Sequence, residues 1–209
     1  MRQRSPSASS APAAPAPTRR GLLTRLARLT QLALVANLAA LAPPALPAMA
    51  RDSALERSVK AAYLYKFLAY TDFPAHAFID PTAAIVIGVV GSEDMAGEVQ
   101  RIVANRTING RAIIVRSWRD GEQTGPAHLL FVAGADCARV ARVLRQSPPG
   151  PILLVSECGS GLQAGSTINF KIIEQHVRFD VSLDAAEKSN IKLSSRLLSV
   201  ANHVTKGVP

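Results

Sequence analysis

The sequence predicts an α/β domain with a mostly parallel sheet, helices on both faces and an antiparallel C-terminal hairpin. Short apolar runs rich in branched residues alternate with amphipathic helical segments between residues 84 and 155. Parallel strands need this alternation because a crossover must separate them. Near the C-terminus only three polar residues, 174–176, separate two apolar runs, as in a hairpin. The 209 residues are 48% hydrophobic, which is enough for one ordinary core.

The N-terminal segment has the composition of a signal peptide. A Ser-, Ala- and Pro-rich stretch with arginines and no acid precedes an apolar run at residues 29–42. That run is too short to span a membrane, and Ala48-Met49-Ala50 then offers the small side chains of a signal peptidase site. We therefore predict a signal peptide at residues 1–50, cleaved near Ala50, and a periplasmic domain at residues 51–209 without an integral membrane segment.

Two alternatives to cleavage remain open. Arg25 and Arg28 interrupt the apolar face, so the segment could instead be an amphipathic helix that stays attached. The other alternative is a retained membrane anchor. Export is favoured because the basic, apolar and small-residue regions follow one another in the required order.

Export also changes the meaning of the net charge. The formal charge of the whole chain is +9, a value typical of nucleic-acid binders. Removal of residues 1–50 leaves 18 basic and 15 acidic side chains, a net charge of about +3, because it takes away six arginines: Arg2, Arg4, Arg19, Arg20, Arg25 and Arg28. The mature domain is therefore not expected to bind nucleic acid.

A helix is expected to open the mature domain. Asp52 or Ser53 can cap its start, and it should end before Phe73-Pro74, because the residue ahead of a proline avoids helical geometry. Its helical spacing is carried by six residues: Leu55, Val59, Ala62, Tyr63, Phe67 and Tyr70. The aromatic residues of this stripe are expected to serve the core. Tyr65 and Lys66 point elsewhere, which makes them candidate contacts for a partner or ligand.

Four strands and two helices are expected next. Ser92 is placed to cap a helix that runs to about Val103, and Asp136 to cap a helix that runs to Arg145. The proline-rich stretch at 148–151 stops the second helix. The expected strands are residues 84–90, 112–115, 128–132 and 152–155.

The last third of the chain follows a different pattern. Residues 166–173 and 177–183 are the two arms of the antiparallel hairpin, which is expected at the edge of the sheet. A short helical turn at 184–188, a short strand at 191–193 and a closing helix at 194–200 follow it.

Two glycine-containing loops resemble catalytic motifs only superficially. The segment Gly88-Val89-Val90-Gly91 lies between a strand and a helix, but it lacks the third glycine of a dinucleotide site and the Gly-Lys-Ser/Thr ending of a phosphate loop. Glu93 and Asp94 would repel a phosphate, so an ordinary tight turn is predicted. Gly159 and Ser160 follow the fourth strand without the spacing of a nucleophile elbow. A flexible loop that offers a partner or ligand surface is therefore favoured over hydrolysis by Ser160, and no catalytic residue is predicted.

Cys137 and Cys158 are predicted to form a disulfide. Paired cysteines of an exported protein usually do so, because the compartment is oxidising. Each follows the end of a predicted strand by a few residues, so parallel neighbouring strands would bring both to one sheet edge. Closing the intervening loop contributes roughly 3 kcal/mol. A passive staple is favoured, and a redox-sensitive clamp is the alternative.

No metal ion or other cofactor is expected. The two cysteines do not have the spacing of a metal site. The four histidines are scattered along the chain: His76, His128, His176 and His203.

Several blocks of the mature domain resemble the YfiR-like family of exported bacterial proteins. Each block alone is weakly specific, but together they frame nearly the whole mature domain in the family's order. They are residues 59–67, Phe73-Pro74, 151–156, 165–170, 177–186 and 191–198.

The resemblance implies a periplasmic regulator with an α/β sandwich fold that is often dimeric. It implies that the chain binds the periplasmic sensor domain of an inner-membrane diguanylate cyclase and holds that enzyme inactive. Release of the cyclase would raise cyclic di-GMP and favour biofilm formation. An alternative from another class is a periplasmic small-molecule-binding accessory of a transporter or sensor kinase, with its ligand at the carboxyl ends of the strands.

The chain departs from the family in its cysteines. The best-known members resemble a two-disulfide design, whereas this chain can form one bridge at most, so a redox switch is not carried over. Asn169, Arg178, Asp184 and Arg196 lie in the matching blocks and are expected to be structural. In particular, Arg178 is expected to pair with Asp184 across the hairpin.

Overall fold

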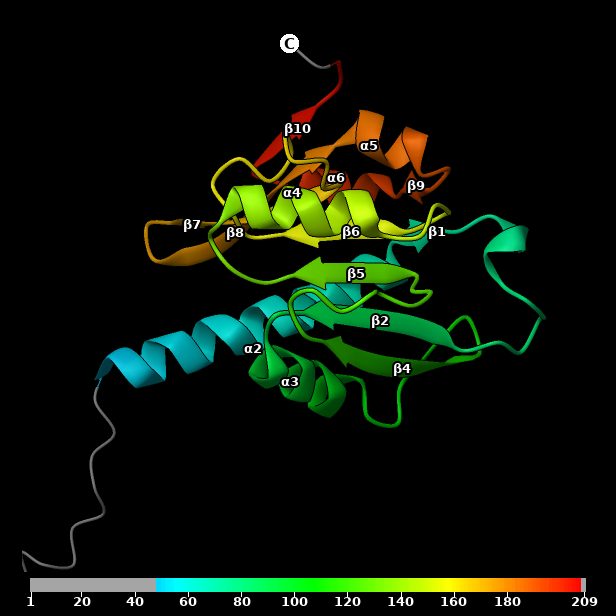
Figure 1. Cartoon of the computed structure of the whole chain (residues 1–209), viewed down its shortest axis with the longest axis horizontal. Coiled ribbons are helices and arrows are strands. Elements are labelled where there is room, and N and C mark those ends of the chain that lie inside the picture. Colours follow the sequence, from blue (N-terminus) through cyan, green and yellow to red (C-terminus); the bar gives the residue numbers. More distant parts are fainter. Residues whose placement is uncertain (1–47, 208–209) are drawn as a thin grey trace, which may run out of the picture. The chain divides into compact units, whose positions relative to one another are not determined.

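The computed structural model describes residues 48–207 of the chain (Figure 1). The chain divides into the units Met1–Leu46 and Pro47–Pro209, and only the second is described. The predicted signal peptide therefore lies outside the described residues except for its last three positions. Helix α2 (Ala48–Ala69) includes those three, so the predicted cleavage point lies within its first turn.

The start of α2 corrects the predicted boundary. Asp52 and Ser53 lie inside the helix and do not cap it, since the helix begins at Ala48. Alanine and methionine are strong helix formers, so Ala48-Met49-Ala50 extends the helix toward the N-terminus. The stripe is also rotated from the prediction. Leu55 is 66% exposed, and the fully buried side chains of α2 are Ala61, Leu64, Phe67 and Leu68.

The main sheet of the described region has eight strands in the order β10-β8-β7-β6-β5-β2-β4-β3. β2 pairs in parallel with β4 and β5, β5 with β6, and β6 with β7, which confirms the predicted parallel sheet. The strands are Ile85–Val90 (β2), Thr107–Ile108 (β3), Arg111–Trp118 (β4), Leu129–Val132 (β5), Leu153–Ser156 (β6), Ile168–Ile173 (β7), His176–Ser182 (β8) and His203–Thr205 (β10).

The C-terminal hairpin is present but is not the outermost element. β7 and β8 pair antiparallel, as predicted, through a two-residue turn at Glu174 and Gln175. β10 pairs in parallel with the outer side of β8 and so becomes the edge strand. The prediction that the hairpin forms the sheet edge is therefore wrong, because one further strand, β10, lies outside it. A strand of three residues is too short to show a periodic pattern in the sequence.

The remaining elements are short helices and a second small sheet. Ser92 caps α3 by accepting a hydrogen bond from the Met95 amide at 3.2 Å, and Asp136 caps α4 by accepting from the Ala138 and Arg139 amides. Both caps agree with the sequence. The helices are α3 (Glu93–Val103), α4 (Cys137–Gln146), α5 (Leu183–Lys188), α6 (Ser195–Ser199) and the 3-10 helix η1 (Ala75–Ala77), and the small antiparallel sheet pairs β1 (Thr71–Asp72) with β9 (Lys192–Leu193).

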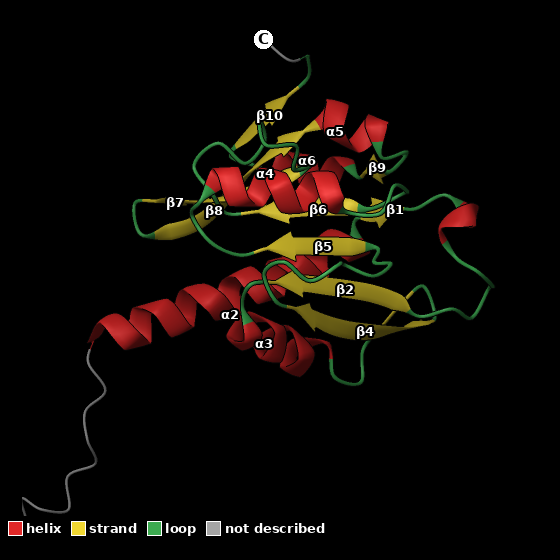
Figure 2. Ribbon diagram, in the orientation of Figure 1, coloured by secondary structure: helices red, strands yellow, loops and turns green. Residues whose placement is uncertain are grey.

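Helices cover both faces of the main sheet and create two cores. Figure 2 shows α4 in front of the sheet and α2 passing behind it. The larger core lies under α2 and α3 and contains an aromatic cluster of Tyr63, Phe67, Phe170 and Phe179, with ring centroids 4.9–6.1 Å apart. The smaller core lies under α4 and contains Val90, Leu130, Val132, Val140, Leu144, Ile152 and Cys158.

Gly88 has a packing role in β2. A Cβ atom at this position would lie 2.3 Å from the ring of Trp118, so only glycine lets the indole lie against the strand. Within the Gly88–Gly91 segment, the first three residues belong to β2, and only Gly91 lies in the tight turn that leads to α3. Gly91 provides the positive φ of +81° that this turn needs.

Candidate functional site

An open, largely apolar groove lies between α2 and the β7–β8 hairpin. We call it the α2–hairpin groove. Its volume is about 610 Å³. Figure 1 shows the first turns of α2 and the hairpin extending from the same side of the sheet. Its apolar walls are Leu55, Val59 and Tyr63 of α2 facing Ile172 and Val177 of the hairpin, and its polar lining is Glu56, Gln175, His176 and Arg178.

The hairpin forms one wall of the groove because its tip extends beyond the core. The first three residues of β7 are buried and the last three, from Lys171 on, are exposed. Glu174 and Gln175 have positive φ values of 50° and 62°, as the central residues of a type I′ turn do. Neither is a residue type that adopts this conformation easily. The turn therefore holds Ile172 in an exposed position, at 50% accessibility.

An internal ion pair fixes α2, the other wall of the groove. Lys60 is only 7% exposed, and its ammonium group donates hydrogen bonds to Glu56 and, at 2.6 Å, to Glu157. Burial alone would lower the pKa of Lys60, but the bonds to Glu157 and Glu56 outweigh it and raise the pKa above the ordinary value. Glu157 also accepts from the Gly134 amide at 2.6 Å. The helix is thus tied to the carboxyl ends of β5 and β6.

The predicted disulfide is present, and one of its cysteines, Cys158, directly follows Glu157 in the sequence. Cys137 at the start of α4 is bonded to Cys158, which is fully buried, and their Cα atoms are 5.3 Å apart. β5 and β6 are parallel neighbours, which is the arrangement that the sequence prediction required. Asn169 donates a hydrogen bond to the Cys158 carbonyl at 2.9 Å, and this buried contact gives Asn169 the structural role that was expected.

The sequence-predicted surface residues lie outside the groove. Tyr65 is half-buried, with the Arg106 guanidinium 5.0 Å above its ring, and Lys66 is exposed on α2. Gly159 and Ser160 are exposed in the loop after β6, where the Ser160 amide donates to Cys137 Sγ at 3.2 Å. The structure does not unite the four residues in one pocket. Their contact with a partner or ligand stays a prediction.

The groove was missed because its residues have the same periodicity as buried ones. Leu55 belongs to the apolar stripe that the sequence assigned to the core, but α2 buries a different face, and Ile172 and Val177 continue the apolar alternation of their strands. The predicted pair between Arg178 and Asp184 is wrong. Arg178 lines the groove, and Asp184 accepts from the Gly207 amide at 2.8 Å. Lys171 pairs with Asp180 across the hairpin instead.

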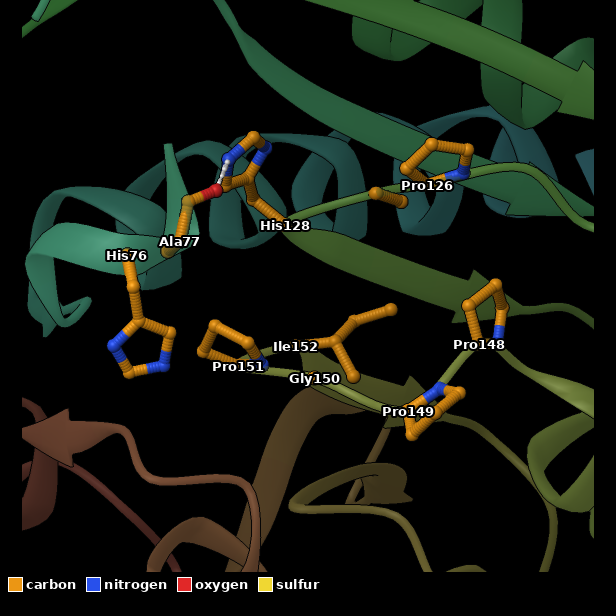
Figure 3. Close-up of a pocket in the computed structure, with 10 residues that line it drawn as sticks. His76, Ala77, Pro126, His128, Pro148, Pro149, Gly150, Pro151 and Ile152 are labelled. Atoms are coloured by element: carbon orange, nitrogen blue, oxygen red, sulfur yellow. Dashed lines mark hydrogen bonds between the residues drawn. The ribbon is translucent and has the colours of Figure 1, made fainter. Parts of the chain in front are cut away.

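A smaller pocket of about 150 Å³ lies at the opposite, amino-terminal ends of β5 and β6. Figure 3 shows His76, His128 and prolines from two loops around it. His128 Nδ1 accepts from the Val86 amide at 3.0 Å, so the other nitrogen, Nε2, carries the proton and donates to the Ala77 carbonyl at 3.1 Å.

The surroundings of His128 keep its ring neutral. It stacks on Phe78 at 4.7 Å, and the Arg111 guanidinium lies 3.8 Å from the centre of the same Phe78 ring. Burial lowers the pKa of His128, the Ala77 bond opposes this, and the Arg111 charge lowers it further. The histidine therefore fastens the loop after β1 to the sheet in its neutral form.

The described residues do not suggest a catalytic metal centre. No group of three or more histidine, cysteine or acidic side chains within residues 48–207 is arranged to hold a metal ion. Over the same range, no helix has both the length and the apolar character needed to cross a membrane. The fold and the groove together describe an α/β domain with an open apolar groove beside its sheet.

Comparison with known proteins places this domain in a family. The chain belongs to the YfiR/HmsC-like family, whose model matches residues 57–202. The family is one of regulatory proteins, and membership supports, in general terms, a role in the periplasmic regulation of cyclic di-GMP signalling. The sequence-based recognition of this family is confirmed. No curated protein matches the chain.

A solved structure supports the fold. A conserved domain protein from Vibrio cholerae O1 biovar El Tor is similar, with a TM-score of 0.50 and 8% sequence identity. The similarity covers 71% of this chain and 60% of that protein, so the chain spans less than two thirds of its neighbour's length. At this identity the likeness concerns the fold alone.

Proposed function

We propose that this protein binds the periplasmic sensor domain of an inner-membrane diguanylate cyclase and represses it, which lowers cyclic di-GMP. Family membership supports the signalling pathway, and the α2–hairpin groove supports a protein contact. The observation that carries the proposal is the exposure of Leu55 and Ile172 on facing walls, at 66% and 50%. Their burial against a partner would contribute about 25 cal/mol per Å² of apolar surface.

The rim of the groove specifies the chemistry of the partner. Among the described residues Arg178 has no ion-pair partner, whereas Glu56 is paired with Lys60. The partner should therefore insert an apolar side chain between the walls and place a carboxylate beside Arg178. An apolar centre with a polar rim is the usual anatomy of such interfaces.

Repression follows if the groove discriminates between two states of the sensor domain. A ligand shifts a conformational equilibrium only by its difference in affinity for the two states. The regulator must therefore bind the inactive arrangement more tightly, and its dissociation frees the cyclase. No chemical step is required of the regulator.

The proposal is tested by capture of the cyclase from inner-membrane extract, with residues 51–209 as bait and mass spectrometry as readout. We expect recovery of a protein that combines a periplasmic sensor with a diguanylate cyclase domain. Ile172→Glu should abolish its capture, because the substitution puts a charge into the apolar wall. Ile79→Glu is the matched control, since Ile79 is 100% exposed and does not line the groove.

The same assay separates the alternatives. Capture that is lost with Lys66→Glu or Ser160→Arg, but kept with Ile172→Glu, would assign the contact to the sequence-predicted surface. Failure of the folded wild-type bait to retain any cyclase would contradict repression and favour the small-molecule accessory. In cells, Ile172→Glu should raise cyclic di-GMP to the level of a deletion strain, while Ile79→Glu should not.

A further inference from the structure

The outer edge of β4 is open over most of its length. β4 has eight residues and pairs with β2 on its inner side from Ile113 to Trp118. On its outer side, β3 pairs only with Arg111 and Ala112. Beyond Ala112, no strand of the described region pairs with the outer side of β4. Figure 1 shows β4 as the lowest labelled strand, on the far side of β2 from β5.

The backbone groups at this edge can be assigned from the pairing on the inner side. The Trp118 carbonyl accepts from the Gly91 amide at 3.0 Å, so the backbone of Trp118 faces β2. Backbone groups of successive residues in a strand point to opposite sides. The amides and carbonyls of Ile113, Val115 and Ser117 therefore point outward, where the described chain gives them no hydrogen-bond partner. They form a row of donors and acceptors that can pair with a further strand.

Proteins usually protect a free edge strand, because it can pair with another chain. Very short strands and prolines are two such protections. The opposite edge of this sheet is formed by β10, which has three residues. β4, in contrast, is the longest strand of the described region and contains no proline. Its one charged side chain between Ile113 and Trp118 is Arg116, which leaves the edge open and selects what can pair with it.

The side chains of β4 alternate between the two faces of the sheet. Ile113 and Val115 pack against the larger core under α2 and α3. Ile114 and Arg116 point to the opposite face, where both are exposed and Ile114 is 44% accessible. A strand added at this edge would therefore meet an apolar side chain and a guanidinium on the same face, at alternate positions.

The guanidinium of Arg116 is available to a partner. It has no ion pair within the described residues. The acids of the following loop are engaged elsewhere, since Asp120 pairs with Arg139 and the Glu122 carboxylate accepts from the Arg119 amide at 2.8 Å. The uncompensated charge beside Ile114 is therefore positive.

The charge of the strand disfavours a second copy of this chain as the occupant. Residues 111–119 contain three arginines and no acid. Two copies paired through this edge would bring the arginines of both strands together, and like charges across a strand pair are destabilising. A strand with acidic side chains gains an attraction in the same place. The charge complementarity therefore favours an acidic partner strand.

We propose that the outer edge of β4 binds an extended acidic segment of a partner protein, which adds a strand to the main sheet. The backbone of the segment pairs with Ile113, Val115 and Ser117. One of its apolar side chains packs on Ile114, and a carboxylate at the next position on the same face pairs with Arg116. The edge shares no residue with the α2–hairpin groove, so this inference does not rest on the identity of the cyclase.

Two peptides of equal length and opposite charge test the edge. The full 209-residue chain is labelled with ¹⁵N and titrated with a capped peptide that repeats Thr-Val-Thr-Glu, and with the same peptide carrying lysine in place of glutamate. We expect the acidic peptide to bind at least about fivefold more tightly. It should slow hydrogen exchange at the amides of Ile113, Val115 and Ser117. Equal affinity, or slower exchange at other amides only, would overturn the proposal.

Hydrogen exchange of the free protein tests whether the edge is open. The amides of Ile113, Val115 and Ser117 should exchange quickly, whereas those of Ile114 and Arg116, which face β2, should exchange slowly. Slow exchange at all of these amides would overturn the proposal, because the edge would already be occupied. Protection that increases with protein concentration would identify a second copy as the occupant and would overturn it as well.

Arg116→Glu tests the charge of the site. The substitution should reverse the preference, so that the peptide with lysine binds more tightly than the peptide with glutamate. Arg142 is exposed on α4 and has no ion pair within the described residues, so Arg142→Glu is the matched control and should keep the preference for the acidic peptide. An unchanged preference in Arg116→Glu would contradict the proposed contact.

Ser117→Pro tests the backbone pairing. Proline removes an outward-facing amide and leaves the ladder to β2 in place, as at the positions where edge strands tolerate it. The variant should lose binding of the acidic peptide, while the amides of Ile114 and Arg116 stay protected. Binding retained by folded Ser117→Pro would overturn strand addition. If Ser117→Pro does not fold, the comparison of Arg116→Glu with Arg142→Glu decides.

Discussion

The two faces of the main sheet are stabilised in different ways. On the α2 and α3 face, 24 buried residues form a continuous apolar core centred on stacked aromatic rings. On the α4 face the buried apolar cluster has only seven members, and one of them is Cys158 of the disulfide. A small core contributes little to stability, and exported domains commonly compensate with a covalent link.

The smaller face also contains a buried cluster of hydrogen-bonded polar side chains. Ser156, Asn169 and Ser166 bond to one another or to the Cys158 carbonyl beneath the loop that follows β6. Gly161 packs so closely on this group that a Cβ atom there would lie 2.1 Å from Asn169 Oδ1. One face is thus held by apolar area, and the other by a bridge and directed hydrogen bonds. The following changes test that difference.

The largest effect is expected in the larger core. Phe67→Ala removes a fully buried ring that stacks on Phe170, so it should lower the free energy of unfolding by about 3–5 kcal/mol. Urea denaturation followed by circular dichroism measures this change. Leu55→Ala on the same helix is the control and should change stability by less than about 0.5 kcal/mol. A smaller loss for Phe67→Ala than for removal of the disulfide would reverse the comparison.

Removal of the bridge tests the smaller face. Cys137→Ala combined with Cys158→Ala should cost about 3 kcal/mol, because the unfolded chain regains the freedom of the 21-residue separation. Denaturation with and without a reductant gives the value, and the double variant should no longer respond to the reductant. Unchanged capture of the cyclase by the double variant identifies a passive staple. Loss of capture by a double variant that is still fully folded would identify a redox-sensitive clamp.

Acidification tests the hydrogen bonds of His128, which directly precedes β5. The pKa of His128 is lowered from 6.5 in the folded state, so its contribution to stability is complete above about pH 6.5 and is lost as the pH falls through the lower folded pKa. Protonation takes the acceptor away from the Val86 amide. Urea midpoints measured from pH 8 to pH 5 should therefore decrease.

Two histidine variants assign this acid effect. His128→Asn should lower the urea midpoint at neutral pH and flatten its pH dependence. His76→Gln alters the exposed histidine of the same pocket and should leave the pH dependence as in the wild type. A pH dependence that is the same in His128→Asn as in the wild type would show that another group titrates.

The smallest effect is expected at the tip of the hairpin, outside both cores. Glu174→Asn with Gln175→Gly places residues suited to positive φ in the type I′ turn, so it should stabilise the protein by about 1 kcal/mol. Thermal unfolding measures the gain. Glu187→Asn is a control at an exposed helical position and should give no stabilisation. If Glu174→Asn with Gln175→Gly does not raise the unfolding temperature either, the turn does not store strain.

Much of the fold follows from the sequence because its main signals are local. The strands at 85–90, 129–132 and 153–156 are apolar runs bounded by turns, and Ser92 and Asp136 mark helix starts. β1, β3, β9 and β10 have two or three residues each, which is too few for a periodic pattern. Their pairing is set by the tertiary structure alone.

The candidate sites could be predicted only in part. The disulfide followed from strand order, since both cysteines come after strands that are parallel neighbours. The α2–hairpin groove could not be predicted, because the spacing of apolar residues in α2 did not show which face packs on the sheet, and the exposure of Ile172 depends on how far the hairpin extends beyond the core.

The contact between Trp118 and Gly88 has a spectroscopic consequence. Trp118 is the only tryptophan of the chain, and it packs against the smaller core. Its fluorescence therefore reports on the stapled face, while circular dichroism reports on the helices of both faces. The protein thus carries a natural optical label on one side, and a difference between the two unfolding curves would show one face opening before the other.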